Sequence, residues 1–437
     1  MLTRWRSGAA AAIALTGAHL ATAGEVFQNP VRLEADGKVI DRGENWGHAS
    51  PCIEDLDGDG LADLLVGDFQ GKFRVYKNVG RQGSPRYTDA GLLKAGGTDA
   101  EVRIYCCVGG QPRFVDLDGD GLRDMISSSY DPGHCYLFRG LADHKFAARE
   151  ELKDKAGVPV RSTPAQQEDV QSFGSFYTPV DWDADGDNDL LIGTFEGKLL
   201  LRVNEGSTKR PEFAAENQPV LAGGEPLEVE QHCCPLVADW DGDGLWDLLS
   251  GCGKGGVTWF RNAGTKESPL FEKGVKLVEN HPSDGYNLLY WNDSEVVPGI
   301  RSQIEVVDHN GDGKLDLLVG DFYTAFEPKP DLDPATRQQV IERAAENAAL
   351  TRKYVDKLEA LRQDFHQRYP EYGDEAQQFW EKEHEVLQNS SEHKVMEKNE
   401  AEFSRWLRPK LARTRGPGDE TFHLAPAHGF VWLYTRK

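Results

Sequence analysis

The residues of this chain with the clearest chemistry are the aspartates of an acidic nine-residue loop that occurs five times. The first copy begins at Asp55 with the pattern Asp-x-Asp-Gly-Asp-Gly-x-x-Asp, and the others begin at residues 116, 181, 239 and 308. Oxygens at positions 1, 3, 5 and 9 can converge on one point, and Ca²⁺ takes about six to eight oxygen ligands. We therefore predict up to five structural Ca²⁺ sites. The predicted metal ligands are Asp55, Asp57, Asp59, Asp63, Asp116, Asp118, Asp120, Asp124, Asp181, Asp183, Asp185, Asp189, Asp239, Asp241, Asp243, Asp247, Asp308, Asn310, Asp312 and Asp316.

The sequence after each loop distinguishes it from an EF-hand. An EF-hand requires a Glu at position 12 and flanking helices. Position 12 is instead Val, Ser, Ile, Ser and Val in the five copies, and short apolar runs such as Leu64–Val66 follow position 9. Such runs are typical of buried strands, so each loop is predicted to join two strands. A single copy could be only a solvated turn, but five copies in phase favour metal binding.

The loops also define a register that brings a second set of residues together. Seven positions before the first Asp stand His48, Gly109, Gly174, His232 and Arg301, near the start of each predicted inner strand. Two histidines and an arginine at one mouth could bind a ligand or perform acid-base chemistry on an acidic sugar. The alternative is that they only meet solvent or backbone, and no catalytic residue is assigned. The candidate ligand-binding residues are His48, His232, Arg301, Trp46, Tyr105, Phe173 and Trp291.

The spacing of the loops indicates a repeat architecture. Successive first aspartates are 61, 65, 58 and 69 residues apart, and each unit reads as four short strands. Four antiparallel strands per unit describe a propeller blade. The last unit has no fourth strand, whereas residues 26–33 resemble a fourth strand without a unit before it. We predict an all-β propeller of five blades, closed by the N- and C-terminal strands. An open array, or a larger ring with degenerate blades, is the alternative.

The region between Phe322 and Gly429 has a different, helical pattern. Asp333-Pro334 is a good N-cap and first-turn pair. Apolar residues then recur at helical spacing as far as Tyr369, and a second helix is predicted from Asp374 to Leu411. This α-helical hairpin interrupts the last blade and is predicted on the face opposite the acidic loops. The predicted organisation is a signal peptide (1–23), the propeller (24–326), the hairpin insertion (327–426) and the closing strand (427–437).

Composition and the N-terminus bear on location and partners. The 437 residues carry a formal charge of −23, which argues against nucleic acid as a partner. Residues 1–23 combine Arg4 and Arg6 with an Ala-rich apolar run, the pattern of a secretory signal peptide, and no transmembrane segment is expected after cleavage. An exported protein, periplasmic or extracellular, is therefore expected. Export permits disulfides, and a Cys234–Cys252 bridge is predicted, with buried free thiols as the alternative.

The acidic motif, followed by an apolar strand and Gly, resembles the FG-GAP/VCBS repeats of bacterial exported proteins and integrin alpha-chain propellers. This resemblance covers residues 25–325 and 427–437. It implies structural Ca²⁺ in the strand-joining turns and ligand recognition through the opposite face. The chain departs from integrin-type propellers in having five units rather than seven, and the hairpin is foreign to the repeat. Similar repeats occur in some polysaccharide lyases and sugar dehydratases, so the fold does not settle the activity.

These observations favour an exported, calcium-binding, non-catalytic module for binding or adhesion to a protein or glycan. The alternative is a calcium-dependent polysaccharide lyase or sugar-modifying enzyme that uses the propeller mouth. A third possibility is an assembly scaffold in which the helical hairpin mediates self-association.

Overall fold

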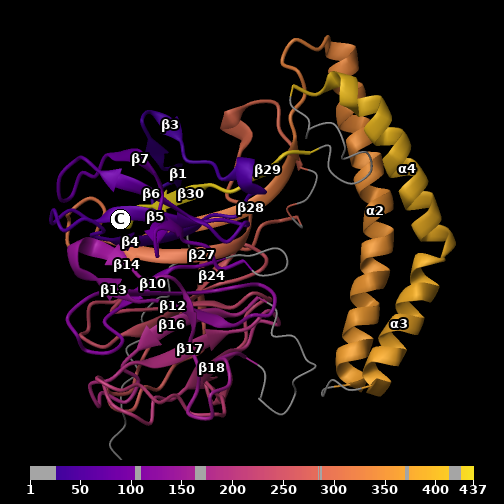
Figure 1. Ribbon diagram of the computed structural model, residues 1–437. Coiled ribbons are helices and arrows are strands. Elements are labelled where there is room, and N and C mark those ends of the chain that lie inside the picture. The colour runs from indigo at the N-terminus through magenta and orange to yellow at the C-terminus, as the bar shows by residue number, and fades with distance from the viewer. Residues whose placement is uncertain are drawn as a thin grey trace, which may run out of the picture.

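A computed structural model describes residues 26–103, 110–162, 174–283, 285, 288–369, 374–412 and 425–437. The chain forms a body of small antiparallel sheets with a helical hairpin beside it (Figure 1). The predicted signal peptide lies outside the described residues, as do Tyr105, Gly109 and Phe173. Among the described residues, no helix combines the length and apolar character needed to cross a bilayer.

Four sheets each take their four main strands from consecutive parts of the chain. The first sheet contains β4 (Ser50–Glu54), β5 (Asp63–Gly67), β6 (Phe73–Asn78) and β7 (Tyr87–Leu92), with β2 (Glu34–Ala35) and β3 (Lys38–Val39) at its outer edge. The second contains β10 (Arg113–Val115), β11 (Asp124–Ser128), β12 (Cys135–Phe138) and β15 (Glu150–Glu151). The third contains β16 (Phe176–Val180), β17 (Asp189–Gly193), β18 (Leu199–Arg202) and β19 (Gln218–Pro219). The fourth contains β22 (Cys234–Ala238), β23 (Asp247–Gly251), β24 (Val257–Phe260) and β25 (Val275–Val278).

The fifth sheet combines strands from both ends of the sequence. Its strands are β27 (Ile300–Val307), β28 (Asp316–Phe326), β30 (Val431–Tyr434) and β1 (Val31–Arg32). Val31 lies opposite Leu433 and Arg32 opposite Trp432, in antiparallel register. The segment near residue 31 therefore occupies the fourth-strand position of the last sheet, which is the pairing expected from the sequence. Two short strands, β26 (Leu288–Leu289) and β29 (Ala427–His428), pair with the far end of β28.

Short strand pairs and single 3-10 turns lie in the segments between the main strands and after α4 (Ser391–Leu407). The pairs are β8 (Lys94–Ala95) with β9 (Thr98–Asp99), β13 (Gly140–Leu141) with β14 (Lys145–Phe146), and β20 (Leu221–Ala222) with β21 (Glu225–Pro226). The 3-10 turns are η1 (Gly43–Asn45), η2 (Ala142–His144), η3 (Asp293–Glu295) and η4 (Arg408–Lys410).

The apolar runs after the acidic loops form the second strand of each sheet, and these strands are covered on both faces. Leu65 belongs to a buried cluster shared with the second sheet, whereas its neighbours Leu64 and Val66 belong to a cluster shared with the fifth. Similar clusters join the second sheet to the third, the third to the fourth and the fourth to the fifth. A strand buried on both faces needs a continuous rather than an alternating apolar pattern. The Leu-Leu-Val type of run is therefore explained by packing between neighbouring sheets.

The glycine that ends most of these runs is required by the close approach of the next sheet. A Cβ built on Gly193 would lie 1.9 Å from the carbonyl oxygen of Cys233, and one on Gly320 would lie 1.9 Å from that of Ala49. Any side chain at these positions would collide with backbone of the neighbouring inner strand. The packing of one sheet against another thus explains why an apolar run is followed by Gly in the sequence.

The described part of the helical region contains three α-helices rather than the predicted two. α2 (Pro334–Arg368) begins at the predicted N-cap, where the Asp333 side chain accepts hydrogen bonds from the backbone N–H groups of Ala335 and Thr336. The second arm is divided into α3 (Asp374–Gln388) and α4 (Ser391–Leu407). Ser390 interrupts it by capping α4, because its side chain accepts a hydrogen bond from the backbone N–H of His393. The prediction of one continuous helix from Asp374 to Leu411 was therefore wrong.

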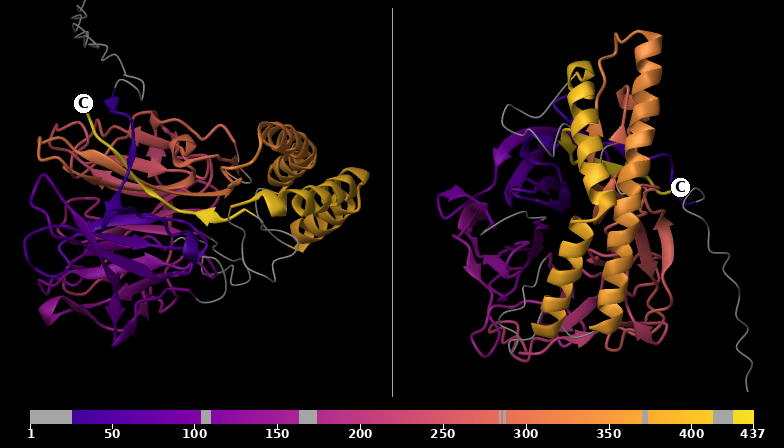
Figure 2. Two further views of the ribbon diagram at one scale, coloured as in Figure 1. Left: turned by 90° about the horizontal axis from the view of Figure 1, so that it is seen from above. Right: turned by 90° about the vertical axis from the view of Figure 1, so that its right-hand side faces the viewer.

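The hairpin lies across one face of the sheets (Figures 1 and 2). β28 begins at an acidic loop and ends at Phe326 beside the hairpin, so the helices lie at the end of the strands opposite the acidic loops. Phe326 packs there with Val340 of α2 and with Phe403 and Leu407 of α4. The two connections run side by side, since the backbone N–H of Lys329 donates to the carbonyl of Lys410 at 2.8 Å.

The predicted Cys234–Cys252 disulfide is absent. Both thiols are free and buried, because the register pairs Cys234 with Gly251 and places Cys252 one residue beyond the end of β23. The Cys234 thiol instead donates a hydrogen bond to Gln111 Oε1 at 2.7 Å. Burial raises the pKa of the Cys234 thiol to about 11, so this side chain is a neutral donor at physiological pH.

Candidate functional site

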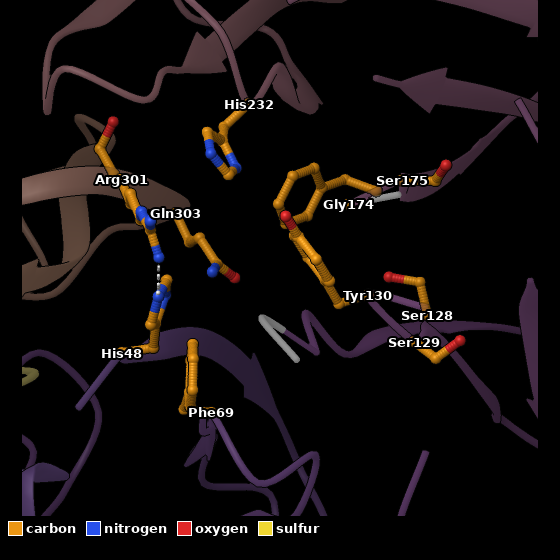
Figure 3. A pocket seen from close by; sticks show the side chains of 12 residues that line it. His48, Phe69, Ser128, Ser129, Tyr130, Gly174, Ser175, His232, Arg301 and Gln303 are labelled. Carbon is orange, nitrogen blue, oxygen red and sulfur yellow. Dashed lines mark hydrogen bonds between the residues drawn. The ribbon is translucent and has the colours of Figure 1, made fainter. Parts of the chain in front are cut away.

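A cavity of about 140 Å³ lies where the inner strands of several sheets begin (Figure 3). Its lining residues lie at the starts of first strands and the ends of second strands, so the cavity is at the end of the strands opposite the acidic loops. Four of the five register-equivalent positions singled out in the sequence reach this cavity: His48, Gly174, His232 and Arg301. The fifth, Gly109, lies outside the described residues. The remaining lining residues are Phe69, Ser128, Ser129, Tyr130, Ser175, Phe176, Ser302 and Gln303.

The backbone at these four equivalent positions adopts the left-handed conformation. The φ angles are 58° at His48, 61° at Gly174, 47° at His232 and 55° at Arg301. Glycine adopts this conformation readily, whereas other L-residues pay roughly 1–2 kcal/mol for it. Three of the four positions nevertheless carry a large polar side chain. Strained residues of this kind concentrate at binding and catalytic sites.

His48 is held between two aromatic rings and one guanidinium group. Its imidazole stacks on Phe69 and Phe322 with centroid distances of 5.0 and 4.7 Å. Arg301 Nη1 lies 3.0 Å from His48 Nε2, and because arginine can only donate, this nitrogen accepts the hydrogen bond. Burial and the nearby charge of Arg301 keep the pKa of His48 well below its usual value, so the ring is neutral. The remaining proton of this neutral ring is therefore on Nδ1.

His232 is the second neutral imidazole at the cavity. Its ring contacts Phe195 edge-on with a centroid distance of 4.3 Å. Burial, followed by the charge of Arg301, lowers the pKa of His232 to about 3. Both histidines are consequently uncharged at neutral pH, whereas the guanidinium of Arg301 keeps its charge. The arrangement offers one cation and two polar rings in a largely aromatic surrounding.

A set of aromatic residues around the cavity was missed by the sequence analysis. Fourteen positions after the first Asp of each loop stand Phe69, Tyr130, Phe195, Gly253 and Phe322. Four of the five are aromatic. Phe69 and Tyr130 line the cavity, while Phe195 and Phe322 pack on the histidines. The sequence could have revealed these residues, because the same counting from the first Asp of each loop, carried on past the second strand, reaches an aromatic residue in four of the five units.

Beneath the cavity, polar side chains of the inner strands fill the centre of the body. Ser50 donates to Gln303, and the amide of Gln111 donates to the carbonyl of Ile304. Deeper still, Arg113 Nη1 lies 2.9 Å from Glu305 Oε2 in a buried ion pair. These interactions join the inner strands of the first, second and fifth sheets below the cavity.

Two predicted ligand-binding aromatics lie elsewhere. Trp46 is 46% exposed and is not among the described lining residues. Trp291 packs at the hairpin base, where the guanidinium of Arg337 lies 4.4 Å from its ring centroid. Tyr105 and Phe173 lie outside the described residues. Of the seven candidate ligand-binding residues, the structure thus brings together His48, His232 and Arg301.

The five acidic loops share one backbone conformation at the opposite end of the strands. In the first loop, Asp55 accepts hydrogen bonds from the backbone N–H groups of Gly58 and Gly60, which have φ angles of 75° and 84°. The equivalent fourth and sixth residues of the other loops also have positive φ, including the non-glycine residue Ala184 at 60°. The tight turn that gathers the carboxylates therefore depends on left-handed residues at these two positions.

Carboxylates converge in four of the loops. The groups with ligand oxygens within 4.8 Å of one another are Asp55/Asp57/Asp63, Asp116/Asp118/Asp120, Asp181/Asp183/Asp185 and Asp239/Asp241/Asp243. In the fifth loop, the Asn310 amide donates to Asp312 at 3.0 Å. Oxygen-only donor sets of this kind suit a hard cation such as Ca²⁺. Basic side chains also reach these carboxylates, as Lys77 does at Asp57 and Arg261 at Asp241.

The ninth residue of each loop has a further, structural role. Asp189 accepts hydrogen bonds from the backbone N–H groups of Trp182 and Asn204, at 3.1 and 2.6 Å. Asp63 and Asp247 bind the corresponding turn after their third strand in the same way. Burial raises the pKa of Asp189 to about 6. These carboxylates thus connect the acidic loop to the turn that follows the third strand.

Comparison with known proteins gives limited likeness. No family model matches the chain. Integrin alpha-4 of Xenopus laevis is 28% identical over 199 residues, which are 41% of this chain and 17% of that protein, so the chain spans about one-sixth of this relative. Solved structures with a similar arrangement include an N-acetylglucosamine-specific lectin from Agrocybe aegerita, at 20% identity, TM-score 0.30 and 62% coverage of each chain. The alpha-L-arabinofuranosidase PaAbf62A from Podospora anserina gives 12% identity and TM-score 0.38 over 69% of this chain and 89% of that one.

Proposed function

We propose that the five sheets are the blades of one closed β-propeller. Two observations support this: β1 completes the last sheet beside β30, and a buried cluster joins the fifth sheet to the first through Leu318 and Leu64. In a closed ring the unpaired edge of each inner strand faces the central axis, where the other blades protect it. The ring also gives the starts of those strands a common axis, which is where the cavity lies.

We infer that the protein is a binding module whose ligand enters this cavity. The observation that carries the proposal is the convergence of His48, His232 and Arg301 from equivalent left-handed positions. Folding alone would favour glycine at each position, as in the third sheet at Gly174, so retention of three strained polar residues points to selection for a ligand. A protein or a glycan presented to the hairpin-bearing face would reach them.

The test is a binding screen that compares the wild-type protein with variants in which a side chain at the mouth is replaced. Labelled protein would be applied to an array of extracellular glycans and matrix proteins, and hits would be re-measured with His232→Ala and Arg301→Ala. The control is Arg210→Ala, because Arg210 is an exposed residue of the segment between β18 and β19 and its side chain pairs with Glu212. Ligands that bind all three variants equally would show that the mouth is not the site.

We propose that the acidic loops hold Ca²⁺ and stabilise the fold from the opposite end of the strands. Their role is supported by the converged carboxylates and by the shared turn geometry. At a free concentration ten times the Kd, each ion adds roughly 1.4 kcal/mol to stability. Thermal unfolding with and without a chelator tests this proposal. Melting curves that coincide, together with no Ca²⁺ bound in equilibrium dialysis, would refute it.

A sugar-modifying enzyme is the second candidate. It is favoured by one observation, the two neutral imidazoles beside a guanidinium, because a neutral imidazole can accept a proton while arginine binds an acidic sugar. Incubation with acidic polysaccharides, followed by detection of unsaturated products, tests this activity. If products form with the wild-type protein and not with His232→Ala, the protein is a lyase rather than a binding module.

Export and the role of the hairpin belong to the same proposal. The signal-like sequence at residues 1–23 and the suitability of the loops for extracellular Ca²⁺ support a periplasmic or extracellular location. The hairpin stands on the same face as the cavity and packs on the body at its base, so it is placed to contact a bound partner or a second copy of the chain. Mass in solution, measured with and without residues 333–411, distinguishes these roles, since only self-association changes the number of chains per particle.

A further inference from the structure

Four of the five junctions between neighbouring sheets are joined by a small turn that we call the latch. After the fourth strand of the first sheet, the chain forms the hairpin β8–β9, and the backbone N–H of Gly96 donates to the carbonyl of Phe146 in the second unit at 2.9 Å. The latches at the other three junctions donate from Lys155 to Phe213, from Gly223 to Phe271 and from Asp36 to Tyr87, at 2.9, 2.8 and 3.1 Å. A latch thus fastens each of these sheets to an aromatic residue of the next.

The aromatic residues that accept these bonds occupy one position of the repeat. Each lies opposite a residue at or just after the end of the third strand: Tyr87 with Asn78, Phe146 with Gly140, Phe213 with Asn204 and Phe271 with Asn262. In the fifth sheet Phe27 lies opposite Arg436. In all five sheets the backbone N–H of the opposite residue donates to the ninth residue of its acidic loop. Phe27 is therefore the residue that a fifth latch would bind.

The fourth sheet lacks this latch because its chain takes a shorter path. In the first sheet, Leu93 bonds to the first residue of the third strand, and Val102, nine positions later, bonds back to the turn before that strand. The third and fifth sheets have the same spacing, from Val220 to Val229 and from Leu33 to Arg42. In the fourth sheet His281 makes the corresponding bond, to Lys254, only three positions after Val278. The six residues that would form the latch are missing.

The carbonyl of Phe27 is consequently left without a donor. No described residue donates a hydrogen bond to it, although each of the four equivalent carbonyls accepts one. Phe27 is only 4% exposed and packs on Trp240 and Tyr434, so little of this residue is open to water. A buried carbonyl without a hydrogen bond is energetically costly, and a donor that entered from outside would remove this cost.

A groove of about 710 Å³ lies where the missing latch would be. Its described lining consists of residues 27–30 beside the fifth sheet, 278–282 beside the fourth and 297–299, together with Gly255, Tyr434 and Lys437. None of these residues also lines the mouth, so the groove is a separate site. Its volume corresponds to roughly 24 water molecules at about 30 Å³ each, which is room for a turn of several residues.

We propose that this groove binds a glycine-containing turn of a partner protein, which donates a backbone N–H to Phe27 and takes the place of the missing latch. The latches that are present define the chemistry that is recognised. At Asp36, Gly96 and Gly223 the donor residue has a φ angle of 52°, 58° and 62°, and the glycine that follows is also left-handed. Ala precedes each of these donors. A partner segment of the type Ala-Gly-Gly or Ala-Asp-Gly therefore fits, because such residues form tight turns with two positive φ angles.

The occupant is a different protein rather than a second copy of this chain. All four latches in the described part of the chain are engaged at their own junctions, so a second copy has no unused latch there to offer. Peptides that add to the edge of a sheet gain affinity from main-chain hydrogen bonds and selectivity from the adjoining side chains. Val278, Val297 and Pro298 provide an apolar surface of this kind, and Val297 is 46% exposed.

The experiment uses the full-length protein and the latch of the third sheet as the probe. A synthetic peptide of residues 220–229, cyclised to hold the Gly223-Gly224 turn, is titrated by calorimetry, and we expect one peptide to bind per chain. N-methylation of Gly223 removes the donor and should weaken binding about three- to tenfold. Val297→Glu places a charge at the groove and should weaken binding roughly tenfold or more. The matched control is Val79→Glu, at a valine of the first sheet that is 40% exposed, and it should leave binding unchanged.

The remaining outcomes would overturn the proposal. Absence of binding, or equal binding of the N-methylated peptide, would show that the groove does not recognise a latch, and both measurements use the wild-type protein alone. Equal binding by Val297→Glu would place the peptide elsewhere. If sedimentation shows a dimer that Val297→Glu dissociates, a second copy is the occupant. If the peptide binds only after removal of residues 1–23, the N-terminus of the chain is the occupant. None of these results bears on ligand binding at the mouth.

Discussion

Replacing His232 should reveal the strain stored at the mouth. Its φ angle is 47°, and Gly174 occupies the equivalent position of the neighbouring sheet with φ 61°. His232→Ala and His232→Gly both remove the imidazole and its contact with Phe195, so the lost packing is the same in each. The two variants differ only in the residue that must adopt the left-handed backbone.

The expected difference follows from two opposing effects. Alanine pays roughly 1–2 kcal/mol for the left-handed conformation, whereas glycine does not. Alanine also loses less freedom on folding, which favours it by about 0.4–1 kcal/mol. The net result is that His232→Gly should be more stable than His232→Ala by about 0.5–1 kcal/mol. For a protein of this size, that is a melting temperature higher by about 1 °C.

At a control position, the order of stability of the alanine and glycine variants should be reversed. His134 precedes β12 and does not have positive φ, so His134→Ala should be more stable than His134→Gly by about 0.4–1 kcal/mol. Differential scanning calorimetry of the four variants measures both comparisons under identical conditions. If alanine were the more stable replacement at His232 as well, the left-handed backbone at the mouth would carry no strain, and the argument from strain to ligand binding would fail.

Three further predictions concern the ion pairs and the hairpin. Although burial opposes it, the carboxylates of Asp41 and Glu327 raise the pKa of His428 to about 9 from 6.5. This shift stabilises the folded state by on the order of 3 kcal/mol. The stabilisation is complete below pH 6.5 and is lost as the pH rises through 9. The melting temperature, measured by calorimetry, should therefore fall more steeply at alkaline pH in the wild-type protein than in His428→Gln. Glu305→Gln leaves Arg113 buried without its counter-charge and should cost about 3–5 kcal/mol in thermal unfolding. Asp333→Ala removes the cap of α2 and should reduce helix stability by about 1 kcal/mol, measured by circular dichroism at 222 nm.

The sheets were predictable because the same local chemistry is repeated. Acidic loops, apolar runs and glycines mark the strand pairs in the sequence. The last unit has no fourth strand of its own, which predicted that residues near Val31 supply it. The break at Ser390 was less visible. Ser390 could have been read as a surface residue of a continuous helix, and only its hydrogen bond to the His393 backbone identifies it as a cap. The missing disulfide depends on strand register, which sequence spacing alone did not define.

The candidate site was only partly accessible from the sequence. Counting back from the first Asp identified His48, His232 and Arg301, because equivalent positions of repeated units occupy equivalent places in space. Trp46 and Trp291 were chosen for their nearness in sequence, and the packing directs them elsewhere. The neutral state of the histidines could not be predicted either, since it arises from burial and from a guanidinium on a different sheet.

The pairing of Val31 with Leu433 has a consequence for how the molecule is made. About 400 residues must be synthesised between the two partners, which at about 5–20 residues per second takes roughly 20–80 s. Throughout that time β1 lacks its partner strand, and β28 lacks β30 from its own synthesis until the last residues are added, so these unpaired edges are available to other chains. A chaperone that shields the nascent protein during this wait would protect it from aggregation.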